Sequence, residues 1–425
     1  MPKIRIKNFG PIKEGCVENE GWIEVKKVTV FIGNQGSGKS TVAKVLSTLL
    51  WLEKAINRGD FDQKWSFEAF ENLFLYQSLK DYLRDDTFIE FIGDLYSISY
   101  DKVNHQFPVV AKVENGNYVV PKIMYVPSER NFLSVVKNAT GVRGLPEPLF
   151  EFAEELQKAQ KEYDKKVWLP INQVEYQYDK IKNESYLIGK DFRLNLLHAS
   201  SGFQSLVPLF LVSLNLSWVI DNKFGFDAGN ISPQQSVRMN DEIAHIMLNS
   251  QLEDSEKIKE TNKVKEKFQN RAFINIVEEP ELNLFPSSQK GILESLLAFS
   301  NRNKDNKLIF TTHSPYLINF LSLAIQGKEV KDRILEAQDK VSTDDSKILS
   351  NLAALKIRLG NIVHINSFVD ASNVAIYQFD DHSGSVSILP NPEGIPSDNN
   401  YLNQFIAHGN KLFDQLLEIE EELWV

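Results

Sequence analysis

The sequence predicts an α/β fold, in which a mostly parallel β-sheet is covered by helices on both faces. Four short apolar runs have the length and composition of buried parallel strands, which are hidden on both faces and need nearly continuous apolar residues. Segments whose apolar residues recur at helical spacing separate these runs, and this alternation builds a parallel sheet. The four runs are residues 28–32, 122–126, 272–277 and 307–312.

Composition indicates a globular cytoplasmic protein without a membrane partner. The chain has 425 residues, 42% hydrophobic and 24% charged, and we expect residues 1–425 to form a single domain with insertions. No stretch approaches the ~18 consecutive apolar residues of a membrane span, and the N-terminal residues lack the apolar segment of a signal peptide. Cys16 is the only cysteine, which excludes an intrachain disulfide. The net charge of −10 argues against a permanent, sequence-independent grip on DNA.

The N-terminal part predicts an antiparallel β-subdomain beside the parallel sheet. Residues 3–7 alternate charged and apolar side chains, as a half-buried strand does, and residues 21–25 predict a second short strand. Residues 96–120 are typical of a meander with a hairpin turn at Asn115-Gly116. Residues 51–95 carry aromatic residues at helical spacing and predict a helical insertion, whose aromatics either pack as core or form a base-stacking platform.

Three further segments interrupt or extend the predicted sheet. Residues 147–195 begin with a charged amphipathic pattern and predict a second helical insertion that turns back on itself. Residues 229–271 form a polar excursion before the acidic strand, which is either a solvated helix face or mobile excursion, or a docking surface for a partner. Residues 385–425 predict a C-terminal strand followed by an acidic helix from about residue 403 to 423.

The strongest functional signal is a glycine-rich phosphate-binding loop, GNQGSGKS, at residues 33–40. It follows a predicted strand and precedes a helical pattern, so main-chain N–H groups and a helix N-terminus would face a phosphate. Lys39 would reach the β- and γ-phosphates, and the Ser40 hydroxyl would hold Mg²⁺. We therefore expect ATP and Mg²⁺ as cofactors. The candidate binding residues are Asn34, Gly36, Ser37, Gly38, Lys39, Ser40 and Thr41.

Two adjacent carboxylates follow the predicted strand at 272–277. A carboxylate at a strand end beside a phosphate loop can hold the water shell of Mg²⁺, and its neighbour can accept a proton from the attacking water. We assign Glu278 to the metal and Glu279 to the catalytic base. His313 follows the next strand within the sequence TTHSP. It is a second candidate catalytic residue, because from there it would reach the γ-phosphate and the attacking water.

A third motif, HASSGFQS, occupies residues 198–205. Its small residues Ser200, Ser201 and Gly202 would expose a helix N-terminus that is suited to binding an anion. Alone, this pattern is typical of an ordinary helix cap. Its position between the phosphate loop and the acidic strand makes these three residues candidates for nucleotide binding.

These motifs, in this order, resemble those of ABC-type ATPases, in particular the branch with SMC-like and RecF-like heads. The sequences IKNFGPIK, YVPSER and VEEPELNLFP are similar to bacterial ATPases related to the overcoming-lysogenisation-defect group and to anti-phage defence of the Septu and PARIS types. The resemblance implies an ABC-type P-loop ATPase head with a mostly parallel sheet, an N-terminal antiparallel β-subdomain and helical insertions. It covers roughly residues 1–50, 120–135, 195–220 and 270–380.

The resemblance also implies how the motifs cooperate. Ser200, Ser201 and Gly202 would close on ATP bound by another protomer, so that a homodimer or higher homo-oligomer forms composite sites. Residues 281–284 would couple the two sites, and His313 would be the switch histidine. The chain departs from the family pattern at Glu278, where aspartate is more usual, and at Phe203, where a polar residue or glycine is common.

One further departure concerns the glutamine that usually follows an early strand in this family. Gln106 fits that position poorly, and the segment 128–130 is the alternative occupant of that region.

The resemblance favours an ATPase that controls a separate effector protein, a nuclease of the Toprim or HNH type, in response to DNA or a phage protein. Neither a Toprim Asp-x-Asp pair after His313 nor an HNH cluster is recognised in the sequence. The first alternative is a RecF-like DNA-repair head, which the acidic composition disfavours. The second is a scaffold that binds ATP without hydrolysing it, which Glu279 disfavours. A transporter ATPase is the most distant alternative, because the sequence VEEPELNLFP is not typical of transporter ATPases.

Overall fold

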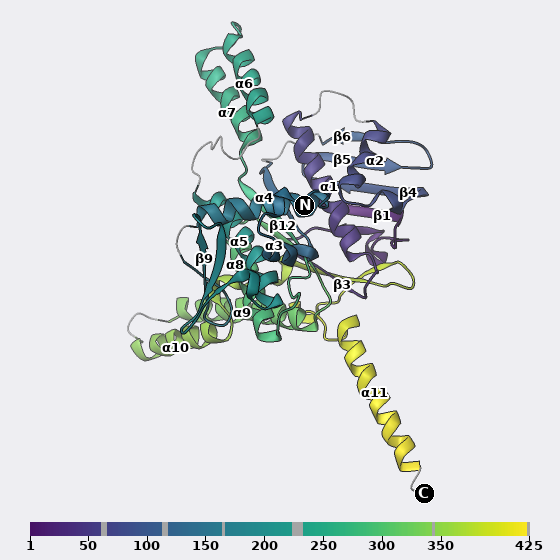
Figure 1. Ribbon diagram of the computed structural model, residues 1–425, viewed down its shortest axis with the longest axis vertical. Helices are drawn as coiled ribbons and strands as arrows, with labels where there is room; N and C mark the ends of the chain where they lie inside the picture. The colour runs from purple at the N-terminus through teal and green to yellow at the C-terminus, as the bar shows by residue number, and fades with distance from the viewer. Residues whose placement is uncertain (61–65, 113–117, 164–165, 223–232, 342–344, 423–425) are drawn as a thin grey trace.

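A six-stranded β-sheet runs through the centre of the computed structural model, which describes residues 1–425 except 61–65, 113–117, 164–165, 223–232, 342–344 and 423–425 (Figure 1). The strand order is β15-β14-β3-β13-β12-β7, and every neighbouring pair is parallel except β14 with β15. The predicted α/β class with a mostly parallel sheet is confirmed. The strands are β3 (Val28–Gly33), β7 (Pro121–Val126), β12 (Ala272–Glu278), β13 (Lys307–Thr312), β14 (Val374–Phe379) and β15 (Val386–Ile388).

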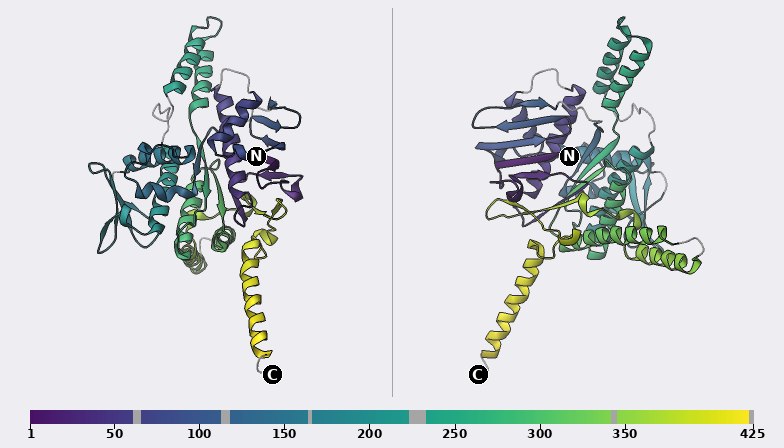
Figure 2. Two further views of the ribbon diagram at one scale, coloured as in Figure 1. Left: turned by 45° about the vertical axis from the view of Figure 1, so that its right-hand side comes forward. Right: turned by 180° about the vertical axis from the view of Figure 1, so that it is seen from behind.

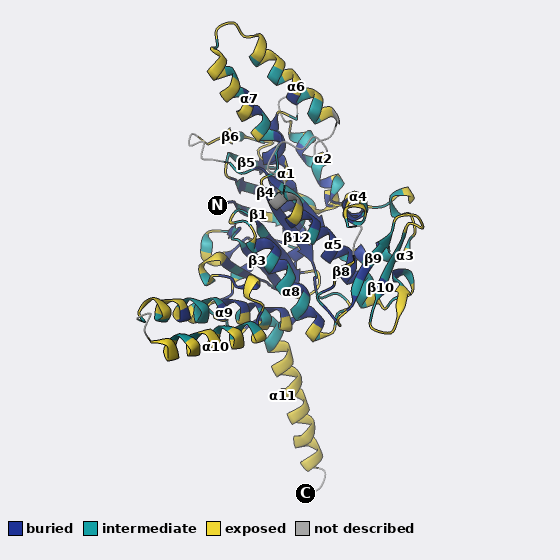
Figure 3. Cartoon of the chain, turned by 90° about the vertical axis from the view of Figure 1, so that its left-hand side faces the viewer, coloured by how far each residue is buried: buried dark blue, intermediate teal, exposed yellow. Residues whose placement is uncertain are grey.

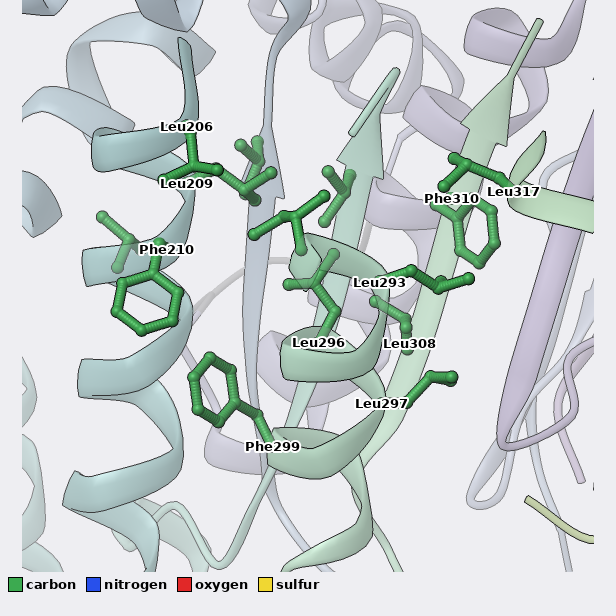
Figure 4. Close-up of a cluster of buried hydrophobic side chains, with 14 of the residues drawn as sticks. Leu206, Leu209, Phe210, Leu293, Leu296, Leu297, Phe299, Leu308, Phe310 and Leu317 are labelled. Carbon is green, nitrogen blue, oxygen red and sulfur yellow. The ribbon is translucent and has the colours of Figure 1, made fainter. Parts of the chain in front are cut away.

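One face of this sheet is covered by helices α5 (Ser201–Asn222), α8 (Pro286–Asn301) and α9 (Pro315–Asp339). Leucine and phenylalanine side chains from the three helices and from β13 interlock in a buried cluster (Figure 4). α4 (Glu147–Glu162) packs beside α5 at the edge of this core. Alternation along β12 sends Phe273 and Val277 to this side.

The opposite face packs on α1 (Lys39–Arg58), which lies between the parallel sheet and a five-stranded antiparallel sheet. Ile274 and Ile276 of β12 point to this side and belong to the same core as Val42 and Leu46 of α1. The predicted N-terminal antiparallel β-subdomain is confirmed, with the order β2-β1-β4-β5-β6. Its strands are β1 (Lys3–Phe9), β2 (Trp22–Glu24), β4 (Leu83–Ile92), β5 (Tyr96–Asp101) and β6 (Val109–Ala111).

The helical prediction for residues 51–95 is correct only in part. α1 continues to Arg58 and α2 spans Phe67–Tyr76, but residues 83–92 form β4 of the antiparallel sheet. Thr87, Ile89 and Phe91 are buried at every second position, so the period is that of a strand and not that of a helix. The predicted hairpin turn at Asn115-Gly116 lies outside the described residues, and β5 and β6 are joined before it.

The second predicted insertion, residues 147–195, begins as the helix α4 but continues as a four-stranded antiparallel sheet. The expected second helix around residues 174–182 is therefore wrong. Antiparallel pairing, from Glu175 opposite Ile188 to Asp179 opposite Glu184, makes residues 175–179 a strand. The strands are β8 (Val167–Trp168), β9 (Glu175–Asp179), β10 (Glu184–Ile188) and β11 (Arg193–Asn195).

Three helical elements project from this body, as the views in Figures 1 and 2 show. The polar segment 229–271 contains two antiparallel helices, α6 (Pro233–Leu248) and α7 (Asp254–Phe268). α10 (Ser346–Ile362) lies along the end of α9, and α11 (Tyr401–Glu422) is the predicted acidic C-terminal helix. All three elements are largely exposed (Figure 3). Within the described ranges, none of the helices has the length and apolar content needed to cross a membrane.

Candidate nucleotide-binding site

The carboxyl ends of β3, β13, β12 and β7 meet at one edge of the parallel sheet. Ligands of open α/β folds bind at this edge, because loops from neighbouring strands converge there. The phosphate loop follows β3, the two glutamates end β12, and His313 follows β13. Segments that lie far apart in the sequence are therefore brought together, as the motif order predicts.

The phosphate loop adopts a backbone that favours glycine. Gly33, Gly36 and Gly38 have φ angles of 149°, 74° and 103°, in the region that glycine adopts readily. A Cβ at Gly33 would lie 2.5 Å from the carbonyl oxygen of Phe379, and one at Gly38 would clash with Ile12. Gly38 precedes α1 and supplies no side-chain cap, so N–H groups of the first turn remain available to an anion.

Lys39 is buried at the start of α1 and turns back onto the loop. Its Nζ donates to the carbonyl oxygens of Gly33 at 3.0 Å and Asn34 at 2.6 Å. Burial lowers the pKa of Lys39 to about 8, against the charges of Glu279 and Glu281, which act to raise it. Its third acceptor is the hydroxyl of Ser37, at 3.4 Å. A buried ammonium whose hydrogen-bond acceptors are all neutral gains from the arrival of an anion.

The remaining predicted loop residues lie around this lysine. Asn34 donates through Nδ2 to Oδ2 of Asp381 at 3.0 Å, which ties the loop to the turn between β14 and β15. Ser37 and Thr41 are buried, whereas Ser40 is exposed in the first turn of α1. Ser40 is thus accessible to a bound ion.

Glu278 ends β12 and, by strand alternation, points to the same face as Ile276, where α1 lies. Its Oε1 accepts a hydrogen bond from the hydroxyl of Tyr125, and its Oε2 accepts one from the N–H of Ser128 at 3.2 Å. Burial, followed by the charge of Glu278, raises the pKa of Tyr125, so this hydroxyl stays a donor. An ionised carboxylate has about four acceptor positions, so Glu278 retains capacity for a hydrated cation.

Glu279 and His313 lie side by side at the sheet edge. Oε1 of Glu279 is 3.5 Å from Nε2 of His313, and both side chains are partly exposed. Glu279 has a left-handed φ of 43°, and its N–H donates to the carbonyl oxygen of Thr311 in β13 at 3.0 Å. The contact with His313 lowers the pKa of Glu279 despite burial, with smaller contributions from Lys39 and Arg130. The carboxylate is therefore ionised and can accept a proton.

Glu281 fixes the main chain at His313 through hydrogen bonds. The sequence analysis did not assign this role to it individually. Its Oε1 accepts hydrogen bonds from the hydroxyl of Thr312 and the N–H of His313, both at 2.7 Å. Its Oε2 is buried and has no partner among the described residues. Burial raises the pKa of Glu281. The third acid of the sequence EEPEL thus orients the strand end that carries His313.

Arg130 is the main residue that sequence reasoning left without a role. It is fully buried at the end of β7, and burial lowers its pKa to about 10. Every hydrogen bond found for it goes to a main-chain carbonyl oxygen on one of three segments. The acceptors are Pro127 at 3.2 Å, Ser205 at 3.1 Å, Glu278 at 2.7 Å and Glu279 at 2.6 Å.

This position also separates the two candidates for the family's glutamine region. Gln106 pairs with Asp101 through the main chain in the turn after β5, within the antiparallel sheet. Residues 128–130 instead lie at the end of β7, where Ser128 and Arg130 contact the acidic strand end. The segment 128–130 is therefore the one that reaches the candidate site.

Ser200, Ser201 and Gly202 lie at the start of α5, on the opposite face of the sheet from α1. The two serines are exposed. A Cβ at Gly202 would lie 2.9 Å from the carbonyl oxygen of Asn283, and Nδ2 of Asn283 donates to Oγ of Ser205 at 3.1 Å. The start of α5 thus packs directly on the loop that follows Glu279 and Glu281.

The fold and the loop define an α/β protein with a P-loop, and comparison with known proteins agrees with this class. Residues 238–318, which include Glu278, Glu279 and His313, match the family described as "AAA ATPase domain". No curated protein matches the sequence.

Comparison with solved structures finds matches at low identity and low TM-score. The SMC head domain from Thermotoga maritima has a TM-score of 0.34 at 12% identity, over 75% of this chain and 90% of that one. The Smc head domain bound to the C-terminal domain of ScpA from Pyrococcus furiosus gives 0.34 at 10% identity, over 91% and 96%. A nucleotide-free ATP-binding cassette from an ABC transporter gives 0.27 at 11% identity, over 93% and 94%. None of these comparisons assigns a role to an individual residue of this chain.

Proposed function

We propose that this chain is an ATPase that binds ATP with Mg²⁺ at the phosphate loop and hydrolyses it with Glu279 as the general base. The observation that carries the proposal is the position of the ionised Glu279, 3.5 Å from His313 and at the same sheet edge as Lys39. A proton acceptor and a phosphate cradle at the same sheet edge, here on strands separated only by β13, are what hydrolysis of a phosphoanhydride requires.

The residues present fit the binding of a nucleotide and a metal. Lys39 donates to two carbonyl oxygens that phosphate oxygens would replace, and the N–H groups at the start of α1 point the same way. Ser40 and Glu278 would hold Mg²⁺ through a hydroxyl and a carboxylate, the oxygen donors that this ion prefers. Mg²⁺, when bound, supplies positive charge that stabilises the charge developing on the phosphate oxygens.

The proton of the attacking water is accepted by a side chain whose position other residues fix. Glu279 accepts the proton of the attacking water at its carboxylate, and His313 holds that carboxylate in place through its Nε2. Because Arg130 and Thr311 fix the main chain on both sides of Glu279, the base keeps its orientation while solvent reaches it.

We infer that the site is completed by a second copy of this chain. The start of α5 is exposed, faces away from α1, and carries the N-terminal partial charge of a long helix. Through Gly202 and Asn283 it contacts the loop that leads back to Glu279. Closure of Ser200, Ser201 and Gly202 on the nucleotide of the other copy would therefore be transmitted to the base.

Mixing two inactive variants tests the composite site. Ser201→Arg places bulk and charge at the closing surface, and Lys39→Ala removes the cation of the phosphate loop. Each variant alone should hydrolyse no ATP. A mixture should regain up to about a quarter of the activity, because half of the pairs at random are mixed and each has one intact site. If no mixture regains activity although both variants fold, each chain works alone.

We also propose that the head controls a separate effector protein, which the α6–α7 hairpin holds. Nη1 of Arg238 in α6 donates to the carbonyl oxygen of Gly59 at 2.9 Å, so the base of the hairpin is fixed to the end of α1. α1 begins at the phosphate loop, and this helix is a direct connection between nucleotide and hairpin. The sequence resemblance to defence ATPases supports a nuclease as the effector and a phage-derived trigger.

Replacement of residues 233–268 by a short Gly/Ser linker tests this role. Asn270 is retained, because its Oδ1 accepts from Nζ of the buried Lys54 at 2.6 Å. The trimmed protein should bind ATP normally and lose the proteins that co-purify with the full chain from its native host. If partner recovery is unchanged, the hairpin is not the docking surface. If the full chain gives no phage protection in that host, the defence role is wrong.

A further inference from the structure

Helix α11 exposes an apolar stripe from Phe405 onward, whereas Leu402 in its first turn is half-buried against the main core. Leu402, Phe405, Gly409, Leu412, Leu416 and Ile419 follow one another at steps of three and four residues, which places them on one side of the helix. Phe405, Phe413 and Leu416 are 66%, 62% and 63% exposed. No residue of α11 is buried, and the helix leads away from the body of the molecule (Figures 1 and 3). A stripe of this kind marks a contact surface.

Helix α10 carries a second exposed apolar stripe, which is flanked by basic residues, whereas α11 ends in acidic ones. Ile348, Leu355 and Ile362 are spaced by seven residues on one side of the helix and are 46%, 41% and 57% exposed. α10 has basic residues at 347, 356 and 358 and no acidic residue. α11 has Lys411 but ends in a run of acids. These are Asp414, Glu418, Glu420, Glu421 and Glu422.

We propose that α11 of one copy packs on the exposed face of α10 of a second copy. Both stripes are apolar and uncovered, and their flanking charges attract each other. Two copies related by a twofold axis would exchange their helices reciprocally, so the contact closes on itself. The contact needs no nucleotide, so it extends beyond the ATP-dependent pairing proposed above.

Two other occupants of the α11 stripe are less favourable. The N–H of Tyr401 donates to Oε1 of Gln378 in β14 at 3.1 Å, which fixes the start of α11. The helix then diverges from α10 of the same chain (Figure 2). A parallel pair of α11 helices would bring two acidic ends together, and like charges at such close range repel. The basic, acid-free α10 avoids this repulsion.

Cross-linking distinguishes these arrangements. Cys16, the only cysteine, is buried, so introduced cysteines report alone. Leu355→Cys and Leu412→Cys proteins are mixed without ATP or Mg²⁺ and treated with a short bismaleimide. We expect a cross-linked dimer from the mixture and much less from either protein alone. Val237→Cys on α6, at a side chain that is 59% exposed against 41% for Leu355, mixed with Leu412→Cys is the control and should give none.

Three results of this experiment would overturn the proposal. A dimer from Leu412→Cys alone at the yield of the mixture would show that α11 pairs with itself. A third sample, one protein that carries both Leu355→Cys and Leu412→Cys, tests the contact within one chain. A cross-link inside its monomer would show that α11 folds back on its own chain. No cross-link in any sample at micromolar concentration would show that a second copy is not the occupant.

Charge reversal gives an independent measurement. Glu418→Lys with Glu421→Lys, or Lys347→Glu with Arg358→Glu, should each weaken self-association at least tenfold in sedimentation velocity without nucleotide. Mixing the two reversed proteins should restore it. Circular dichroism and thermal unfolding confirm that each variant is folded. If the α10 reversal leaves association unchanged while the protein is folded, the proposal is wrong. Every protein in this measurement also carries Lys39→Ala, which removes the cation of the phosphate loop. Self-association is then measured without ATP binding, so this result does not depend on whether the ATPase proposal is correct.

Discussion

Arg130 donates from Nη2 to the main-chain carbonyl oxygen of Glu279 at 2.6 Å, and so fixes the backbone of the proposed catalytic base. The same guanidinium contacts the carbonyl oxygens of Glu278 and of Ser205 in α5. The base, the metal carboxylate and the helix that is proposed to close on a second copy therefore share one buried cation. A planar group with five donors suits this position, since a lysine has three donors at a single point.

Arg130→Lys should separate positioning from binding. An ammonium cannot reach all four carbonyl oxygens, and unpaired buried acceptors should lower the free energy of unfolding by about 2–4 kcal/mol. The turnover number of ATP should fall at least tenfold, while the dissociation constant for ATP changes less than threefold, because Lys39 is untouched. Arg333→Lys, on the exposed side of α9, is the control for the substitution. Normal turnover in a destabilised Arg130→Lys protein would show that Glu279 needs no support from Arg130.

The affinity for ATP should fall as the pH rises above 8. Burial lowers the pKa of Lys39 to about 8 in the free protein, and a bound phosphate favours the charged form and raises it. Below pH 8 the lysine already carries its proton. Between pH 8 and 9 the free protein loses the proton that binding requires, so the affinity at pH 9 should be about tenfold lower than at pH 7.

Calorimetric titration in two buffers of different ionisation enthalpy measures this linkage directly. Binding at pH 9 should take up nearly one proton, and binding at pH 7 should take up little at this lysine. The nucleotide itself has finished titrating in this range, since the last phosphate pKa lies near 6. An affinity that is the same at pH 7 and pH 9 contradicts the role of Lys39.

Gly202→Ala should impair hydrolysis more than binding. The added Cβ would lie 2.9 Å from the carbonyl oxygen of Asn283, so the loop that follows Glu281 must move. We expect turnover to fall about fivefold to tenfold, equivalent to about 1–1.4 kcal/mol of barrier, with ATP binding unchanged. Gly409→Ala is a matched control, because no atom lies within 4 Å of the new Cβ. Equal turnover of both variants would argue against coupling through this contact.

Tyr125→Phe should weaken the binding of Mg²⁺ that turnover requires. The variant keeps the buried ring but removes the hydroxyl that donates to Oε1 of Glu278, so the carboxylate loses one of its two orienting hydrogen bonds. The Mg²⁺ concentration for half-maximal turnover should rise several-fold at saturating ATP. Tyr186→Phe removes a similar hydroxyl that donates to Glu184, in the four-stranded sheet far from the phosphate loop, and should have no effect. An unchanged Mg²⁺ dependence would remove Glu278 from the metal site.

The parts of the site that the sequence predicted are those whose chemistry is local. The phosphate loop contains its own glycines and lysine, and Glu279 and His313 directly follow strands that are largely apolar. Arg130 was not assigned because its acceptors are carbonyl oxygens on separate segments, which every residue possesses and no motif records. Glu281 was assigned only as part of the coupling segment 281–284, because its own hydrogen-bond partners become visible only when β12 and β13 pair.

The errors in the fold have a similar origin. Aromatic residues around β4 fit both a helical and a two-residue period, and pairing with β1 decides between them. For the segment 229–271 the sequence analysis left a solvated helix face and a mobile excursion open. The capping box between Glu253 and Glu256, which starts α7, is a sequence signal that favours the helix. Few residues of the α6–α7 hairpin are buried, so its sequence has no continuous apolar stripe from which the helices could be predicted.

ATP turnover by Glu279→Gln, measured beside ATP binding, tests the central claim most directly. Glutamine keeps the size and polarity of the side chain but cannot accept the proton, so hydrolysis should fall at least a hundredfold. The affinity for ATP should stay within about threefold of the unaltered chain, since Lys39 and the loop remain. Glu336→Gln, on the exposed side of α9, should retain full turnover. Turnover of Glu279→Gln within about tenfold of normal, a loss of only about 1.4 kcal/mol, would contradict the assignment of the base.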